Sequence, residues 1–222
     1  MFQTDPFSLI VLFVGLSLVA FVAMVATSYL KIVVVISLIR NALGIQSIPP
    51  NMVVNALAMI LTFYIMAPVL GEGWGILSKE LATRKGAPAA QVLRETDAAA
   101  KATEPYREWL SARTDARSRQ FFVSTAEQLW AKGDEPAKVD PESFYILVPS
   151  FCVSELSKAF QIGFLVYLPF IAIDIIISNI RLAMGMMMVS PVTISLPFKL
   201  LLFVMVNGWT LLIQGLVKGY MI

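Results

Sequence analysis

The sequence predicts an all-α, integral membrane-type protein, in which helical hairpins with broken helices are combined with a small helical extracytoplasmic insert. Of its 222 residues, 58% are hydrophobic and 14% are charged, and the mean hydropathy is +0.76. This composition is typical of a membrane protein rather than a soluble domain. Most charges fall in one stretch, between long apolar segments marked by prolines. We therefore expect hydrophobic helices in 1–71, a polar, mainly helical periplasmic insert in 72–143, and hydrophobic hairpins in 144–222.

The N-terminal part begins with an almost unbroken apolar run, 7–39. As one helix this run would be about 50 Å long, well beyond the ~30 Å hydrocarbon core of a bilayer. It is therefore expected either to tilt and project or to break near residues 27–28. Gly44 and the following Pro49–Pro50 predict where this segment ends. A second apolar segment then runs from about 52 to 70.

The insert is expected to form two helices. Residues 87–110 are rich in Ala, Glu, Lys, Arg and Gln, which favour helix, although Pro105 interrupts them. A second, amphipathic helix is predicted over 118–132. Its apolar side would carry Phe121, Phe122, Ala126, Leu129 and Trp130. Because positive and negative charges nearly balance here, the insert is interpreted as a solvated cap or docking module rather than a catalytic domain.

The C-terminal part holds apolar runs at 146–151, 159–180 and 197–217. We expect broken helices here, because proline removes a backbone donor and clashes with the preceding turn. The prolines concerned are Pro149, Pro169, Pro191 and Pro197. Broken helices at membrane depth persist only where protein or a water-filled cavity satisfies the freed backbone groups.

Between the last two runs lies a methionine-rich turn, Met184–Met188, which includes Gly185. Three adjacent methionines cannot all face one side of a regular helix, and the flexible thioether side chain specifies packing poorly. Two interpretations follow. The turn is either a soft seal that closes around nothing or around something variable, or a group of lipid-facing or core methionines.

Two charges lie within the C-terminal apolar runs, Asp174 and Lys199. Each would cost a few kcal/mol if it faced lipid, so each is expected to face protein or water and to find a partner. A hairpin folded at the methionine triplet would place them at the same height. We hypothesise an ion pair, within one chain or between neighbouring copies. Alternatively, each charge bonds backbone carbonyls or hydroxyls independently; a proton relay with one carboxylate and no histidine is a poorer alternative.

Composition argues against several classes of function. The chain has no histidine, which is the commonest general base and metal ligand. The single Cys152 has no second cysteine with which to form a disulfide or a metal site, and no phosphate-binding glycine loop or nucleophile motif is present. We therefore expect no enzyme activity, no metal and no cofactor. The net charge of +2 is too small to indicate nucleic-acid binding.

Orientation follows from the charges at the short connections. Lys31 and Arg40 flank the first connection and Arg181 the third. The positive-inside rule places both connections in the cytoplasm and the insert on the far side of the membrane, although Lys218 disagrees.

Several segments resemble one protein family. The segment 149–164 (PSFCVSELSKAFQIGF) resembles a signature of the FliP/SctR/SpaP proteins, the core export-gate subunits of flagellar and virulence type III secretion systems. The sequence Pro197–Phe198–Lys199, with the apolar run into Asn207–Gly208–Trp209, is similar to a second signature. Segments 40–51 and 184–188 also look like family sequence. The resemblance covers nearly the whole chain, and the short N-terminus before residue 7 favours the virulence branch.

The resemblance implies a pore-forming core subunit that passes unfolded proteins out of the cytoplasm. It implies a homopentamer in a helical ring, with SctS/FliQ-like and SctT/FliR-like membrane subunits and an SctU/FlhB-like switch protein as partners. The location would be the bacterial inner membrane, with a periplasm-facing portion. Residue by residue, the resemblance implies a methionine gasket that closes the pore, and buried charges that hold subunits together. The gasket would be Met186, Met187 and Met188, and the charges Glu155, Asp174 and Lys199.

Two other functions are compatible with the sequence. One is a homo-oligomeric ion or small-solute channel, which needs spaced polar groups along its pore, and the sequence offers few. The other is a purely structural membrane scaffold, in which the methionines would tolerate replacement. The gate is favoured on physical grounds, because a ring of flexible apolar side chains excludes water when closed and can deform around any extended polypeptide.

Overall fold

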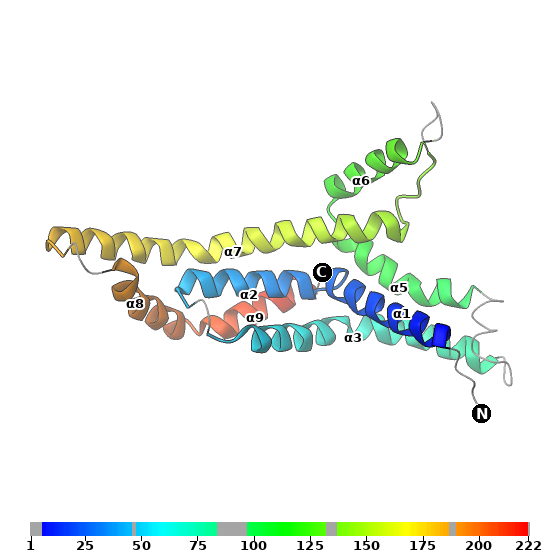
Figure 1. Ribbon diagram of the computed structural model, residues 1–222, viewed down its shortest axis with the longest axis horizontal. Coiled ribbons are helices and arrows are strands. Elements are labelled where there is room, and N and C mark those ends of the chain that lie inside the picture. Colours follow the sequence, from blue (N-terminus) through cyan, green and yellow to red (C-terminus); the bar gives the residue numbers. More distant parts are fainter. Residues whose placement is uncertain (1–5, 46–47, 84–96, 132–136, 187–189, 222) are drawn as a thin grey trace. The chain divides into compact units, whose positions relative to one another are not determined.

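Figure 1 shows the computed structural model, which describes residues 6–45, 48–83, 97–131, 137–186 and 190–221. Within these ranges the regular structure is helical and no strand occurs, so the predicted all-α fold class is confirmed. The helices are α1 (Pro6–Val25), α2 (Tyr29–Leu43), α3 (Asn51–Thr83), α5 (Ala98–Arg113), α6 (Ala116–Leu129), α7 (Phe144–Ala183), α8 (Pro191–Met205) and α9 (Gly208–Lys218).

Membrane-spanning character is concentrated in a few helices. Among the described residues, α3 and α7 are each long and apolar enough to cross a bilayer. The α8–α9 pair, bent by 60°, passes the same test as one broken segment. The chain is therefore a membrane protein by the length and composition of its helices.

The chain forms two compact units. Unit 1 comprises Met1–Leu30 and Met66–Glu155, and unit 2 comprises Lys31–Ile65 and Leu156–Ile222. Both α3 and α7 contribute residues to each unit. The predicted boundaries at residues 71 and 143 separate polar from apolar sequence rather than one compact unit from another. That division stays a prediction.

The first apolar run, 7–39, is divided into two helices. Of the two alternatives predicted from the sequence, the break near residues 27–28 is therefore confirmed. Helix α1 ends at Val25 and α2 begins at Tyr29. At this break the Tyr106 hydroxyl donates to the Ala26 carbonyl (2.5 Å), and the Cys152 thiol donates to the Val25 carbonyl (3.2 Å). The last carbonyls of a helix have no partner within it, so these side chains satisfy groups that the break exposes.

Unit 1 is organised around aromatic packing between α5 and the start of α7. The Tyr106 ring stacks on Trp109 and Phe144, with centroid separations of 6.3 and 6.0 Å, and Trp109 packs on Phe151 at 5.2 Å. The Phe151 side chain is completely buried. Burial of such large rings is an effective source of apolar stabilisation for this unit.

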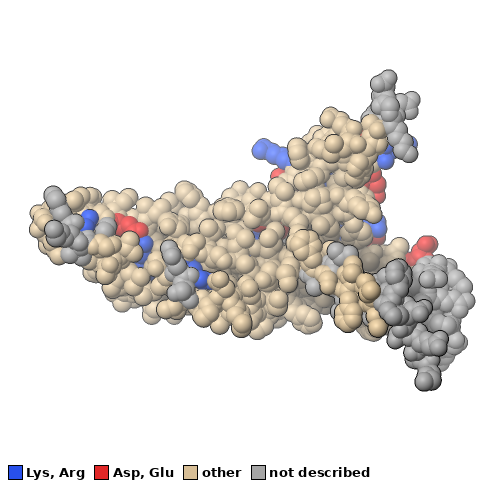
Figure 2. All heavy atoms as spheres, in the orientation of Figure 1, with Lys and Arg blue, Asp and Glu red and all other residues tan. Residues whose placement is uncertain are grey.

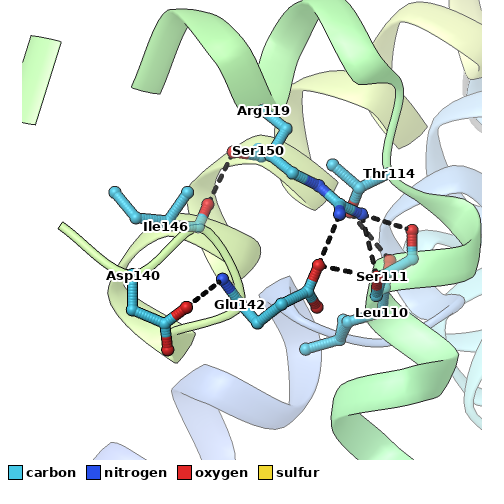
Figure 3. Close-up of polar contacts among 8 residues, drawn as sticks. All are labelled: Leu110, Ser111, Thr114, Arg119, Asp140, Glu142, Ile146 and Ser150. Atoms are coloured by element: carbon cyan, nitrogen blue, oxygen red, sulfur yellow. Dashed lines mark hydrogen bonds and ion pairs between the residues drawn. The ribbon is translucent and has the colours of Figure 1, made fainter. Parts of the chain in front are cut away.

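A polar network ties α5, α6 and the segment before α7 together (Figure 3). The Arg119 guanidinium donates to the Glu142 carboxylate at 2.6 Å and to the Ser111 carbonyl at 2.7 Å. The Glu142 amide in turn donates to the Asp140 carboxylate at 3.0 Å. Because arginine presents several donors in a fixed plane, one side chain can hold two segments in a defined geometry.

Helix α6 packs with only part of its predicted apolar side. Ala126 is buried, whereas Phe121, Leu129 and Trp130 are 61, 74 and 51% exposed. The amphipathic pattern therefore predicts the helix correctly but overestimates how much of it faces the core of its own unit.

Unit 2 is built on the apolar face of α2. Its buried residues recur at helical spacing: Ile32, Val35, Ile36, Ile39 and Leu43. Gly163 of α7 lies against Leu38 of α2, and a Cβ at this glycine would overlap the leucine side chain. The absence of a side chain at residue 163 thus lets the two helices approach closely.

The prediction that prolines break the C-terminal helices is wrong at three positions. Pro149 and Pro169 lie inside the continuous helix α7, and Pro197 lies inside α8. Proline removes one donor, but its fixed φ is compatible with a helix, and packing can satisfy the freed carbonyl. The chain instead leaves the helical region at left-handed residues, namely Gly185 (φ +69°) and Asn207 (φ +51°).

Candidate functional site

The charged centre of unit 2 is the Lys199 ammonium of α8. It donates to the Asp174 carboxylate of α7 at 2.6 Å and to the Ala42 carbonyl of α2 at 3.0 Å. The Lys199 side chain is 7% exposed and that of Asp174 is 40% exposed. The hypothesised ion pair therefore forms within one chain, and the same ammonium also binds a backbone carbonyl.

The hairpin between α7 and α8 brings these two charges together. The rings of Phe170 and Phe203, each four residues farther from the turn, also meet, with centroids 6.4 Å apart. The two helices thus run antiparallel in the register that equal distances from the turn predict. Ala42 lies in the last turn of α2, where a cation also interacts favourably with the helix dipole.

A second polar contact in unit 2 joins α2 to α3 and was not predicted from the sequence. The Arg40 guanidinium donates to the Asn51 side-chain oxygen at 2.7 Å, which joins the end of α2 to the start of α3. Gly44 has φ +79° and ends α2, as its place in the sequence predicts. The sequence did contain a signal for this contact, because Arg40 is a charged residue at the end of an apolar run.

The methionine-rich turn starts at the C-terminus of α7. Gly185 takes a left-handed conformation, and the Met186 amide donates to the Arg181 carbonyl at 3.1 Å, which closes the helix end. Met184 and Met186 are 62 and 39% exposed. Met187 and Met188, the other two residues of the predicted gasket, lie outside the described residues.

Glu155 is the third of the predicted assembly charges. It lies on α7 and is completely buried. It belongs to unit 1, whereas Asp174 and Lys199 belong to unit 2. The structure therefore joins two of the three charges to each other, and the role of all three in holding subunits together stays a prediction.

One further buried cation was not singled out as a site from the sequence. The Lys31 side chain of α2 is buried, with its ammonium 3.7 Å from the centre of the Tyr220 ring. A cation over an aromatic face is attracted by the ring quadrupole, more strongly when both are desolvated. The rule that charges in apolar runs need partners, applied to Lys31, would have predicted a contact but not its identity.

The charged side chains described above make contacts that join helices. Among the described residues, no cluster of three or more His, Cys, Asp or Glu side chains could hold a metal ion. The charged centre is an ion pair bonded to a helix terminus, which fixes three helices in one arrangement. Figure 2 shows charged atoms near the ends of α7 and α8, in a surface otherwise dominated by uncharged side chains.

Comparison with known proteins gives a consistent result. The model of the FliP family matches residues 12–216. The chain is 47% identical over 216 residues to the Yop proteins translocation protein R of Yersinia pestis, covering 97% of each protein. It is 46% identical over 213 residues to the hypersensitivity response secretion protein HrcR of Ralstonia nicotianae, covering 96% of each. It is 40% identical over 195 residues to the flagellar biosynthetic protein FliP of Bacillus subtilis, covering 87% of this chain and 82% of that protein.

Proposed function

The chain belongs to the FliP family, and from this premise we propose that it is a pore-forming core subunit of a type III protein secretion export apparatus. In this role it passes unfolded proteins from the cytoplasm through a methionine-gated channel, and it is not an enzyme. The observation that carries the proposal is the match over nearly the whole chain to relatives named for secretion and translocation. Identity to the Ralstonia and Yersinia proteins, at 46–47%, exceeds the 40% identity to flagellar FliP of Bacillus subtilis, which supports the virulence branch.

The proposed gate is the turn that contains Met186, Met187 and Met188. Support comes from Met184 and Met186, which are exposed at the end of a long apolar helix. Flexible thioethers repeated around a ring can exclude water when closed and can yield to any extended chain. Weak, non-specific contact suits this role, because a substrate that bound tightly would not move on.

The proposed assembly is a homopentamer with SctS/FliQ-like and SctT/FliR-like subunits and an SctU/FlhB-like switch protein. It would lie in the bacterial inner membrane with a periplasm-facing portion. The buried charges Glu155, Asp174 and Lys199 would contribute to subunit contacts. The 40% exposure of the Asp174 side chain supports this, because its carboxylate can accept a further donor from a neighbouring subunit while it remains paired with Lys199.

The decisive experiment places a photo-crosslinking amino acid at Met186, in cells that export a substrate stalled by a folded tag. The control position is Phe121, which is more exposed and lies in the insert. Adducts between position 186 and the stalled substrate, absent without the stall and absent at position 121, are expected. Adducts only to neighbouring subunits, in cells shown to be exporting, would make this chain a scaffold around a pore formed elsewhere.

A further inference from the structure

Helix α9 carries its polar residues on one face. Asn207, which directly precedes the helix, is followed by Thr210, Gln214 and Lys218 at intervals of three or four residues. At 3.6 residues per turn, these four positions fall within a sector of about 80° around the helix axis. All four residues are exposed. Together they are called the polar stripe of α9 below.

The opposite face of α9 is apolar and packs within unit 2. Leu212 and Leu216 are buried, and with Ile39 of α2 they line an apolar groove of about 550 Å³. Beyond the end of α9, the Tyr220 ring lies against the Lys31 ammonium at the start of α2. Helix α9 therefore lies beside α2 and runs in the opposite direction (Figure 1), and its polar stripe faces away from this packing.

Hydrocarbon is a poor environment for this stripe. Helices α8 and α9 together are long and apolar enough to form one membrane-crossing segment with a 60° bend. Within such segments, amide, hydroxyl and ammonium groups are costly to bury in lipid. They generally face other protein groups or a water-filled cavity.

The bend before α9 gives a second and independent reason to exclude lipid. The first N–H groups of a helix have no acceptor within the helix. Asn207 stands in the capping position, but its side chain makes no capping bond to these groups. Residues 204–207 are all exposed, so their own chain does not bury the bend. Irregular backbone at membrane depth is tolerated only where protein covers it or where it lines a water-filled cavity.

We propose that the polar stripe of α9 lines a water-filled passage, with the bend at Asn207 at one end and Lys218 at the other. The rise between these two residues is about 16 Å. Water can satisfy the side chains of the stripe and the uncapped N–H groups together, whereas a neighbouring protein would need a matching group at each position. The inference deepens the proposed function and rests on it for what the passage carries. The presence of water along the stripe does not depend on export.

The passage also suits an extended polypeptide. Amide and hydroxyl side chains both donate and accept hydrogen bonds, so Asn207, Thr210 and Gln214 can bond the backbone of any sequence. Such contacts are exchanged readily with water, which allows a substrate to move on. The stripe is a part of the chain distinct from the methionine-rich turn, and it would contribute hydration where the turn contributes closure.

Cysteine accessibility tests for water along the stripe. Single cysteines replace Thr210 or Gln214 in a Cys152→Ser background, in the complete apparatus and in cells with a permeabilised outer membrane. The controls are cysteines at Leu165 of α7 and Leu201 of α8, which are 65 and 58% exposed within apolar sequence. A membrane-impermeant maleimide reacts with the thiolate, which forms in water and not in hydrocarbon. We expect alkylation to be about tenfold faster at positions 210 and 214 than at the controls.

A stalled substrate tests what the passage carries. When export is stalled by a folded tag on the substrate, alkylation at positions 210 and 214 is expected to fall to the rate of the controls, because the polypeptide excludes the reagent. The photo-crosslinker at Met186 reports in the same cells whether the stalled substrate has entered the apparatus.

Two outcomes would overturn the inference. Alkylation at positions 210 and 214 as slow as at the controls would mean that a neighbouring protein covers the stripe. Fast alkylation that the stalled substrate does not reduce, in cells where position 186 crosslinks to that substrate, would place the stripe at a water surface outside the export path. Fast alkylation without any substrate adduct at position 186 would instead contradict the proposed function and support a water-filled passage of another kind.

Discussion

The Lys199 ammonium and the Asp174 carboxylate differ in their environments, although they form one ion pair. The lysine side chain is 7% exposed and the aspartate side chain is 40% exposed. Loss of the aspartate would leave a buried cation that still donates to the Ala42 carbonyl but has lost its carboxylate. Loss of the lysine would leave a carboxylate that water can reach. At the scale of the residue, the two halves of the pair are not equivalent.

The unequal burial of the two side chains predicts that their replacement lowers the free energy of unfolding by unequal amounts. Asp174→Ala is expected to lower the free energy of unfolding by about 3 kcal/mol, because it strands a buried charge, and Lys199→Met by only about 1 kcal/mol. Thermal unfolding of the full chain in detergent measures both. The double variant should be more stable than Asp174→Ala alone. A Lys199→Met chain less stable than Asp174→Ala would contradict the assignment of the buried partner.

A second prediction at the residue scale is that Tyr106 makes the stability of the chain depend on pH in the alkaline range. Burial raises the pKa of its phenol well above the ordinary value of 10, and the nearby Cys152 adds a smaller increase. Above pH 10 the unfolded chain therefore loses a proton that the folded chain keeps, so the free energy of unfolding falls as pH rises. Below pH 10 this contribution is fully present.

Thermal unfolding on either side of pH 10 tests this linkage. Tyr106→Phe should lower stability at neutral pH by about 1 kcal/mol, through loss of the bond to the Ala26 carbonyl. It should also make stability fall less steeply above pH 10. If the native chain and Tyr106→Phe show the same slope there, the phenol does not carry the alkaline loss.

At the scale of the element, the bend between α8 and α9 depends on a pair of adjacent residues. Asn207 takes a left-handed conformation, and the Phe203 ring packs over Gly208, where a Cβ would overlap it. Asparagine is among the few residues that adopt this conformation readily, and glycine alone leaves room for the ring. The 60° bend therefore follows from local sequence rather than from proline.

Gly208→Ala is expected to destabilise the chain by about 1–3 kcal/mol, because the ring and the bend must shift. Gly215→Ala is its control, since it lies in the same helix with open space around the added Cβ. That control should be neutral or more stable by up to about 1 kcal/mol, from improved helix propensity. Equal effects of the two substitutions, measured by thermal unfolding, would mean that the ring contact does not hold the bend.

At the scale of the whole molecule, the sequence predicts features that depend on local residue type or on distance along the chain from a turn. It does not predict contacts between residues that only the folded structure brings together. The Asp174–Lys199 pair was predictable because both residues lie equally far from the turn, and the end of α2 because Gly44 is free to adopt positive φ. The contact between Lys31 and Tyr220 was not, since nothing in the sequence relates residues so far apart. The proline breaks were misplaced because proline disfavours a helix locally, yet its fixed φ is compatible with one, and α7 continues through Pro149 and Pro169.

The proposed methionine gate is a property of the whole assembly, because it would require a ring that one chain cannot form. In the assembled apparatus, Met186→Ala is expected to increase ion leak across the membrane, since a smaller side chain leaves the closed ring open to water. Met52→Ala, at an exposed methionine of α3, is the control and should not leak. Membrane conductance in cells that carry the complete apparatus measures both. A tight membrane with both variants would favour the scaffold over the gate.

The two side chains that cap α1 have a consequence for biosynthesis. The carbonyls of Val25 and Ala26 receive their donors from residues 127 and 80 positions later in the chain. A ribosome therefore releases the first apolar run long before the partners that divide it exist. Until Tyr106 and then Cys152 are translated, the nascent segment lacks the two donors that bond the Ala26 and Val25 carbonyls. The insertion machinery therefore first handles the boundary between α1 and α2 before these two side chains can bond to it.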